Sequence, residues 1–292
     1  MMMTQDFLVP EDHNRDVSGL TYIYPVVSRR AGGVSIGINL NVNNACNWRC
    51  VYCQVPNLKR GSPDQIDLVL LEKELRGFLN QLLHGDFMER YVAVGDRHLK
   101  DIAFSGNGEP TSAKEFPQVI TIVEKVLHDL KLLDDEHPII KDQAIKVRLI
   151  TNGSLMDKDG VLNSVRHLSK VHGEVWFKVD GGAPEDVARI NDVNINISSV
   201  VKRLKACAAA CPTFVQTCMF GLDGNPPSES HISAYINLLA KVKTDIKGVH
   251  LYGLARPSYQ VEAPRLSRLS AESLEKIADK IRVLGLPVFV SP

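Results

Sequence analysis

The sequence predicts an α/β protein built as a partial (β/α)6 barrel of parallel strands. Runs rich in β-branched residues alternate with segments of helical periodicity along most of the chain, which implies parallel strands joined by right-handed crossovers. Six such units are fewer than the eight that close a full barrel, so we expect a strongly curved open sheet. The 292 residues suffice for one substantial core. We expect residues 34–292 to form a single domain after an N-terminal extension over residues 1–33.

The order of the elements follows from the hydrophobic pattern. The expected strands are 34–40, 101–106, 145–151, 175–180, 213–220 and 248–253, with a last strand at 287–290. The clearest helix spans 67–83, where apolar residues recur on one face at a 3.6-residue period. Weaker helical patterns cover 113–130, 159–171, 198–210, 229–243 and 270–284. In such sheets, functional residues gather where the strands end.

Composition and charge limit the classes of function. The 34 basic side chains balance the 34 acidic ones, so nothing in the overall charge indicates tight, nonspecific binding to nucleic acid. No apolar run approaches the roughly 20 residues that span a bilayer, and the N-terminus lacks the apolar segment of a secretory signal. We therefore expect a cytoplasmic protein with no membrane segment.

Three cysteines follow the first expected strand directly. Cys46, Cys50 and Cys53 have a four-then-three spacing on a loop. Three thiolates so spaced can wrap one face of an iron–sulfur cube and leave one iron without a ligand from the motif. Electron-transfer clusters usually have four cysteine ligands, so the missing ligand indicates a site for a small molecule.

A structural zinc site is the alternative for this loop. Zinc requires a fourth cysteine or histidine close by. The nearest histidines along the chain, His13 and His84, lie more than 30 residues from the motif. The spacing therefore favours an iron–sulfur cluster.

The motif resembles the CxxxCxxC signature of the radical S-adenosylmethionine (SAM) superfamily, including the aromatic Tyr52 before the third cysteine. The resemblance implies a radical SAM core with a 4Fe–4S cluster on Cys46, Cys50 and Cys53, and SAM bound to the open iron. It also implies a flavodoxin or ferredoxin as reductant. Reductive cleavage of SAM would then give a 5′-deoxyadenosyl radical that abstracts hydrogen from a substrate, with the cofactors supplying the difficult chemistry.

Two turns at expected strand ends match further superfamily motifs. Gly108-Glu109-Pro110 looks like the glycine- and glutamate-rich motif that binds the amino group of SAM, although by itself it is an ordinary turn. Asn152 and Ser154 lie in a Thr-Asn-Gly-Ser sequence similar to one that follows the third strand in the superfamily. The resemblance places these polar groups near the ribose or carboxylate of SAM; a plain Asn-Gly turn is the alternative.

The later strands supply further candidates. Alternation places Lys178 and Asp180 on one face of their strand. The resemblance makes both candidates for the SAM ribose or carboxylate, and an internal salt bridge is the alternative. It also suggests Leu251 on the sixth strand for packing against adenine. The possible substrate contacts are Gln216 on the fifth expected strand, and His250, Tyr252 and Arg256 on or just after the sixth.

The other three cysteines lie between residues 207 and 218. Cys207 and Cys211 are four apart on an expected helix and so share a face, and Cys218 falls on the next strand. They could hold a second cluster. The surrounding alanines favour close packing instead, in which cysteine behaves as a small buried hydrophobe.

The substrate is not identified by these motifs. The 35–41 stretch and the Cys-Val-Tyr-Cys-Gln run look most like the group that includes wyosine-type tRNA modification enzymes. Those enzymes carry second-cluster cysteines upstream of the first motif, and residues 1–45 contain none. We therefore predict a radical SAM enzyme of unidentified substrate, with tRNA base modification as an alternative. An iron–sulfur electron-transfer or sensing module is the alternative from another class, and the glycine- and glutamate-rich turn argues against it.

Overall fold

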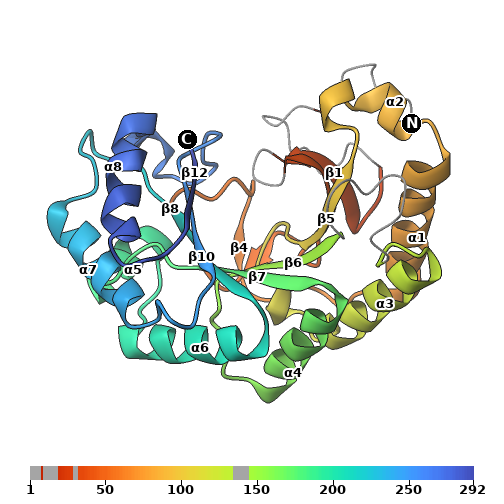
Figure 1. Ribbon diagram of the computed structural model, residues 1–292, viewed down its shortest axis with the longest axis horizontal. Helices are drawn as coiled ribbons and strands as arrows, with labels where there is room; N and C mark the ends of the chain where they lie inside the picture. The colour runs from red at the N-terminus through yellow and green to blue at the C-terminus, as the bar shows by residue number, and fades with distance from the viewer. Residues whose placement is uncertain (1–7, 9–18, 29–31, 134–144) are drawn as a thin grey trace.

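The computed structural model describes Leu8 and residues 19–28, 32–133 and 145–292. Its centre is an eight-stranded sheet that curls into an open half-barrel (Figure 1). The strands, in their order across the sheet, are β1 (Ile23–Ser28), β2 (Gly33–Ile38), β5 (Leu99–Phe104), β6 (Lys146–Thr151), β7 (Gly173–Lys178), β8 (Thr213–Cys218), β10 (Gly248–Tyr252) and β12 (Val288–Ser291). All neighbours are parallel except β1, which runs antiparallel to β2. The predicted partial barrel is confirmed.

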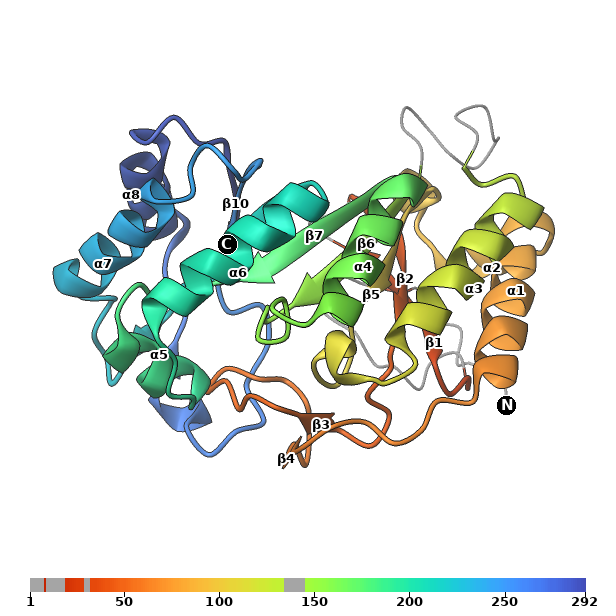
Figure 2. The same ribbon diagram turned by 90° about the horizontal axis from the view of Figure 1, so that it is seen from below.

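Helices cover the convex face of this sheet (Figure 2). They are α1 (Leu68–His84), α3 (Phe116–Asp129), α4 (Asp159–Leu168), α6 (Ile197–Ala210), α7 (Glu229–Ala240) and α8 (Ala271–Arg282), with the shorter α2 (Phe87–Tyr91) and α5 (Pro184–Asn191). The helix α1 begins where predicted, because the Asp67 side chain accepts a hydrogen bond from the Leu70 amide. No helix in the described ranges is long and apolar enough to cross a membrane.

The two faces of the sheet differ in character. On β6 and β7 the side chains of Val147, Leu149, Val175 and Phe177 are buried in the helix-covered core. The alternate residues, such as Arg148, line the hollow of the half-barrel. Successive strand residues point to opposite faces, so the sheet separates an apolar core from a polar inner surface.

Several elements were not predicted. Strand β1 lies within the expected N-terminal extension and adds an antiparallel edge to the sheet; residues 1–7, 9–18 and 29–31 of that extension lie outside the described residues. The division into 1–33 and 34–292 remains a prediction. Also unpredicted are α2, α5 and the small strands β3 (Ala45–Cys46), β4 (Lys59–Arg60), β9 (Gly221–Leu222) and β11 (Leu266–Ser267).

Candidate functional site

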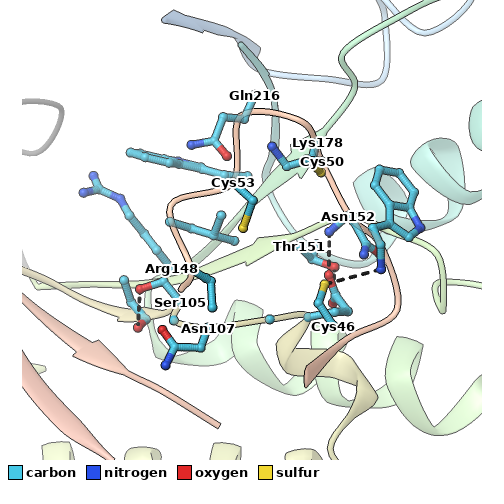
Figure 3. Close-up of a pocket in the computed structure, with 18 of the residues that line it drawn as sticks. Cys46, Cys50, Cys53, Ser105, Asn107, Arg148, Thr151, Asn152, Lys178 and Gln216 are labelled. Carbon is cyan, nitrogen blue, oxygen red and sulfur yellow. Dashed lines mark hydrogen bonds between the residues drawn. The ribbon is translucent and has the colours of Figure 1, made fainter. Parts of the chain in front are cut away.

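A cavity of about 270 Å³ occupies the hollow of the half-barrel. Its walls come from β1, β2, β5, β6, β7, β8 and β10, and from the loop that carries the first cysteine triplet. Cys46, Cys50 and Cys53 all line it, and Figure 3 shows them on a single loop beside Lys178 and Asn152. The structure therefore brings the cysteine motif to the same space as the predicted strand-end residues.

The cysteine loop is held on two sides. On one side, the Val51 amide donates to the Ile190 carbonyl at 2.9 Å, at the end of α5. On the other, the Tyr259 amide and the Ser258 hydroxyl donate to the Cys53 carbonyl at 2.9 and 3.1 Å. Arg49 ties both sides together through Asp192 and Glu262 (2.9 and 2.8 Å). These bonds fix the path of the loop over the strand ends.

Two of the cysteine sulfurs accept N–H hydrogen bonds. The Trp48 amide donates to Cys46 Sγ at 3.4 Å, and Asn191 Nδ2 donates to Cys50 Sγ at 3.2 Å. Burial raises the pKa of Cys46 to about 11 and that of Cys50 to about 12. Because the thiolate is the form that binds metal, a cation in the cavity is needed to ionise them near neutral pH. Three sulfurs, two of which accept N–H hydrogen bonds, form a ligand set that fits an iron–sulfur cluster.

The spread of the side chains bears on the zinc alternative. A mononuclear zinc ion draws its thiolate sulfurs to within about 4 Å of one another, as its bond lengths require. Across the described ranges, no three His, Cys, Asp or Glu side chains converge closely enough to hold a single metal ion. The zinc alternative therefore has no preformed site among these residues.

Glu109 connects the ends of two strands from a buried position. Its side chain accepts hydrogen bonds from the Asn152 amide at 2.6 Å, the Thr151 hydroxyl at 2.6 Å and the Thr111 amide at 3.1 Å. Burial raises the pKa of this carboxyl, and the donors counteract the effect. Glu109 lines the cavity but is already bonded within the chain, so it sets the shape of both turns.

Close packing explains the glycine beside it. A Cβ atom at Gly108 would lie 2.1 Å from the Ala45 carbonyl oxygen, far inside contact distance. The turn after β5 therefore presses against the cysteine loop, and only glycine fits there. Gly108 lines the cavity, whereas Pro110 is buried and does not.

The turn after β6 also contacts the cysteine loop. Asn47 accepts a hydrogen bond from Asn152 Nδ2 and donates one to the Ser154 hydroxyl, both at 2.8 Å. Asn152 lines the cavity and Ser154 does not. The Ser154 hydroxyl thus helps to hold the loop, and its role as a SAM contact remains a prediction.

Lys178 and Asp180 lie in different surroundings. Lys178 lines the cavity, with its Nζ 4.7 Å from the centre of the Tyr52 ring and bonded to the Tyr52 hydroxyl. Asp180 is buried behind it and accepts from the Tyr52 hydroxyl at 2.5 Å. Their charged atoms are 3.6 Å apart, so the internal salt bridge is present. A direct SAM contact is corrected for Asp180, which is absent from the cavity wall, and remains a prediction for Lys178 and Tyr52.

The sixth parallel strand requires another correction. Leu251 is fully buried in the helix-covered core, so it faces away from the cavity and cannot pack against a ligand there. Alternation places Tyr252 on the inner face, where it lines the cavity. His250 lies outside the cavity wall, its ring 4.3 Å from Trp176 and 5.1 Å from Phe289. Of the other predicted substrate contacts, Gln216 and Arg256 do line the cavity.

A charged group inside the half-barrel was not predicted from the sequence. Arg148 donates to Glu174 at 2.6 Å, is bonded to the buried Asp101, and lies over the Trp176 ring at 4.8 Å. Both Arg148 and Asp101 line the cavity. The signal was available, because Arg148 alternates with the apolar residues Val147 and Leu149 on a predicted strand.

The second cysteine triplet is split between two places. Cys207 and Cys211 lie in the core near the start of β8, where the Cys211 thiol donates to the Gly173 carbonyl at 3.3 Å. Cys218 ends β8 and packs in a smaller cluster with Tyr52. Six strand residues separate the two places by roughly 17 Å. The geometry therefore opposes a second cluster held by all three.

A match to a family model identifies the family of this chain. The family model described as the Radical SAM superfamily matches residues 40–234, more than half of the chain. A radical SAM methyltransferase from Sphaerobacter thermophilus superposes with a TM-score of 0.54 at 14% identity, covering 88% of this chain and 66% of that one. Streptococcus suis SuiB bound to S-adenosylmethionine gives 0.53 at 12% identity, covering 89% and 47%. These two likenesses establish the fold alone.

Curated relatives share part of the sequence. A UPF0026 protein from Synechocystis is 24% identical over 170 residues, 58% of this chain and 52% of that protein. A UPF0026 protein from Methanocaldococcus jannaschii is 28% identical over 156 residues, 53% and 39% of the two chains. The GTPase Obg of Brachyspira hyodysenteriae is 27% identical over 134 residues, 46% and 16%. The match thus spans about half or less of each relative.

Proposed function

The chain belongs to the radical SAM superfamily, and we propose that Cys46, Cys50 and Cys53 hold the 4Fe–4S cluster of this enzyme. Membership makes it a radical SAM enzyme that uses such a cluster and SAM. The observation that supports these three ligands is their common position on the wall of one cavity, with N–H donors to two of their sulfurs. When bound, the cluster and SAM supply one-electron cleavage of SAM and a 5′-deoxyadenosyl radical that removes hydrogen from a substrate.

SAM is proposed to lie in the cavity between the cysteine loop and the strand ends. Gly108 lines this cavity where its turn packs against the cysteine loop. Asn152 offers an amide, and Lys178 offers a cation suited to a carboxylate. Tyr52 presents its ring beside that cation. Glu109 acts by fixing the two turns in register, since its carboxylate oxygens are engaged by the chain.

The substrate is proposed to enter the same half-barrel beside SAM. Arg148, Gln216, Tyr252 and Arg256 line the cavity and offer donors and an aromatic ring. Arg148 is held rigid between two carboxylates, which prepares it to orient an acceptor oxygen. No contact among these residues favours a tRNA base over a small molecule. A protein that only transfers electrons needs no polar cavity beside its cluster, so the cavity argues against that role alone.

The superfamily requires an external reductant, and we propose a flavodoxin- or ferredoxin-type protein for this enzyme. A cytoplasmic setting is proposed with it, because reduced thiols persist there. No disulfide joins any of the six cysteines, all of which lie in described residues. This agrees with a reducing compartment.

The proposal is tested by anaerobic reconstitution with iron and sulfide, addition of SAM and dithionite, and measurement of 5′-deoxyadenosine. We expect product from the wild type and none above background from Cys50→Ala. Cys211→Ala is the matched control, because Cys211 lies outside the cavity, and it should retain product formation. Equal product from the wild type and Cys50→Ala would overturn the ligand assignment.

A further inference from the structure

Asn191 connects the cysteine loop to the sheet. It is the last residue of α5 and is 1% exposed. Its side-chain nitrogen donates to Cys50 Sγ at 3.2 Å and to the Asp180 carboxylate at 2.7 Å. A primary amide has two N–H donors, so each of these contacts can use one. The nitrogen is thus fully engaged between a proposed cluster ligand and a buried carboxylate.

The orientation of this amide is dictated by its surroundings. Asp180 is itself fixed, because it accepts from the Tyr52 hydroxyl at 2.5 Å and from the Cys218 amide at 3.0 Å. If the amide were flipped, its oxygen would face the Asp180 carboxylate and the Cys50 sulfur, which are both acceptors. Hydrogen-bond networks decide between such alternatives, and this one turns the nitrogen toward the sulfur.

The backbone around Asn191 supports the same contact. The carbonyls of Ile190 and Asn191 accept from the Val51 and Arg49 amides, at 2.9 and 3.3 Å, on either side of Cys50. The position of Cys50 relative to the end of α5 is therefore set by three hydrogen bonds. The side-chain N–H to sulfur contact is one of them and not a chance approach.

We propose that Asn191 is a positioning residue that raises the reduction potential of the cluster through its hydrogen bond to Cys50. This inference rests on the proposed ligation by Cys50. Hydrogen bonds to cluster sulfurs favour the state with more negative charge, which is the reduced state. The side-chain N–H of Asn191 reaches Cys50 Sγ, so the effect is assigned to that ligand.

The test is a redox titration of the reconstituted wild type and Asn191→Leu, followed by the EPR signal of the reduced cluster. Leucine keeps the shape of asparagine and removes both donors. At a fixed potential near the midpoint, we expect the ratio of reduced to oxidised cluster to fall about tenfold in the variant. This equals about 59 mV for a one-electron couple.

Two control variants separate the effect of the hydrogen bond from Asn191 to Cys50 from a general loosening of the structure around the cysteine loop. Asn196→Ala removes the cap of α6 in the same connection without touching a cysteine, and it should leave the potential unchanged. Tyr52→Phe removes another donor to Asp180 while the Asn191 bond to sulfur remains. The proposal is supported if the reduction potential shifts more in Asn191→Leu than in either control variant. Equal potentials in Asn191→Leu and the wild type would overturn it, while the cluster assignment would stand.

A second measurement uses the wild type alone, in case the variant does not fold. The chain is labelled with nitrogen-15 in asparagine side-chain amides, and the reduced cluster is studied by pulsed EPR. A hyperfine coupling from a side-chain nitrogen is expected, together with an exchangeable proton. Absence of both would contradict the contact. Failure of the wild type to assemble any cluster would instead contradict the proposed function.

Discussion

The two cysteine triplets of this chain have the same residue type in opposite environments. Cys46, Cys50 and Cys53 are partly exposed to a polar cavity on a loop held by hydrogen bonds. Cys207, Cys211 and Cys218 are buried among apolar side chains. The comparison teaches that the chemistry of a thiol is decided by its surroundings, and spacing along the chain is only the first indication. We make four predictions that test this difference between the two triplets.

The largest expected difference is in iron content. Cys53→Ser should abolish stable cluster assembly, because two cysteine ligands cannot hold a cube. Cys207→Ser should load iron like the wild type. The measurement is iron and sulfide per chain after anaerobic desalting. Iron loss in Cys207→Ser with intact iron in Cys53→Ser would reverse the contrast.

On the cavity side, Glu109→Gln should lower SAM cleavage by about tenfold or more. The Thr151 hydroxyl and the Asn152 amide donate to different oxygens of Glu109, so the amide nitrogen of glutamine would face one of these donors in either orientation. Leaving a buried donor without an acceptor costs about 1–3 kcal/mol. The turns that flank the cavity would then shift. Steady-state rates of 5′-deoxyadenosine formation and urea titrations of the same samples give both effects. The control is Glu115→Gln at the N-cap of α3, where the half-buried Glu115 makes no side-chain capping hydrogen bond.

On the core side, Cys207→Ala should cost about 1 kcal/mol of unfolding free energy and leave SAM cleavage unchanged. The side chain is fully buried, and the loss corresponds to roughly one buried methylene-sized group. Urea unfolding of the reconstituted protein under argon measures it. A fall in catalytic rate at unchanged stability would contradict a purely structural thiol.

The smallest effect is a dependence on alkaline pH. Burial raises the pKa of Cys207 from 9.0 to about 12. Above pH 9 the unfolded thiol loses its proton while the folded one keeps it, so this thiol's contribution to stability falls as pH rises. The stability gap between the wild type and Cys207→Ala should therefore narrow as the pH rises from 8 to 9.5. A gap that stays constant would indicate that the Cys207 pKa is unshifted.

Much of the fold was readable from the sequence because it depends on local pattern. The alternation of apolar strands and amphipathic helices located every parallel strand of the sheet. The short helix α5 was missed because its eight residues span too few turns to show a repeating apolar pattern, although Pro184 and the acidic residues after it mark a helix start. Strand β1 was missed because pairing with β2, and not its own sequence, makes it part of the sheet.

Only those parts of the site that lie in recognisable sequence motifs were predicted. The cysteine loop and the turns at Gly108 and Asn152 lie together as expected. Leu251 was assigned to the wrong face, although the apolar Val249 two residues earlier marks that face as the core side. The bond between Asn191 and Cys50 joins residues 141 positions apart, and no local pattern contains such a contact.

The most direct test of the central claim is Mössbauer spectroscopy of the protein reconstituted with iron-57, with and without SAM. Ligation by the loop triplet alone predicts one 4Fe–4S cluster per chain in which a single iron site changes its parameters when SAM is added. A cluster whose iron sites are all unaffected by SAM would contradict the account, as would a second cluster bound by the buried cysteines.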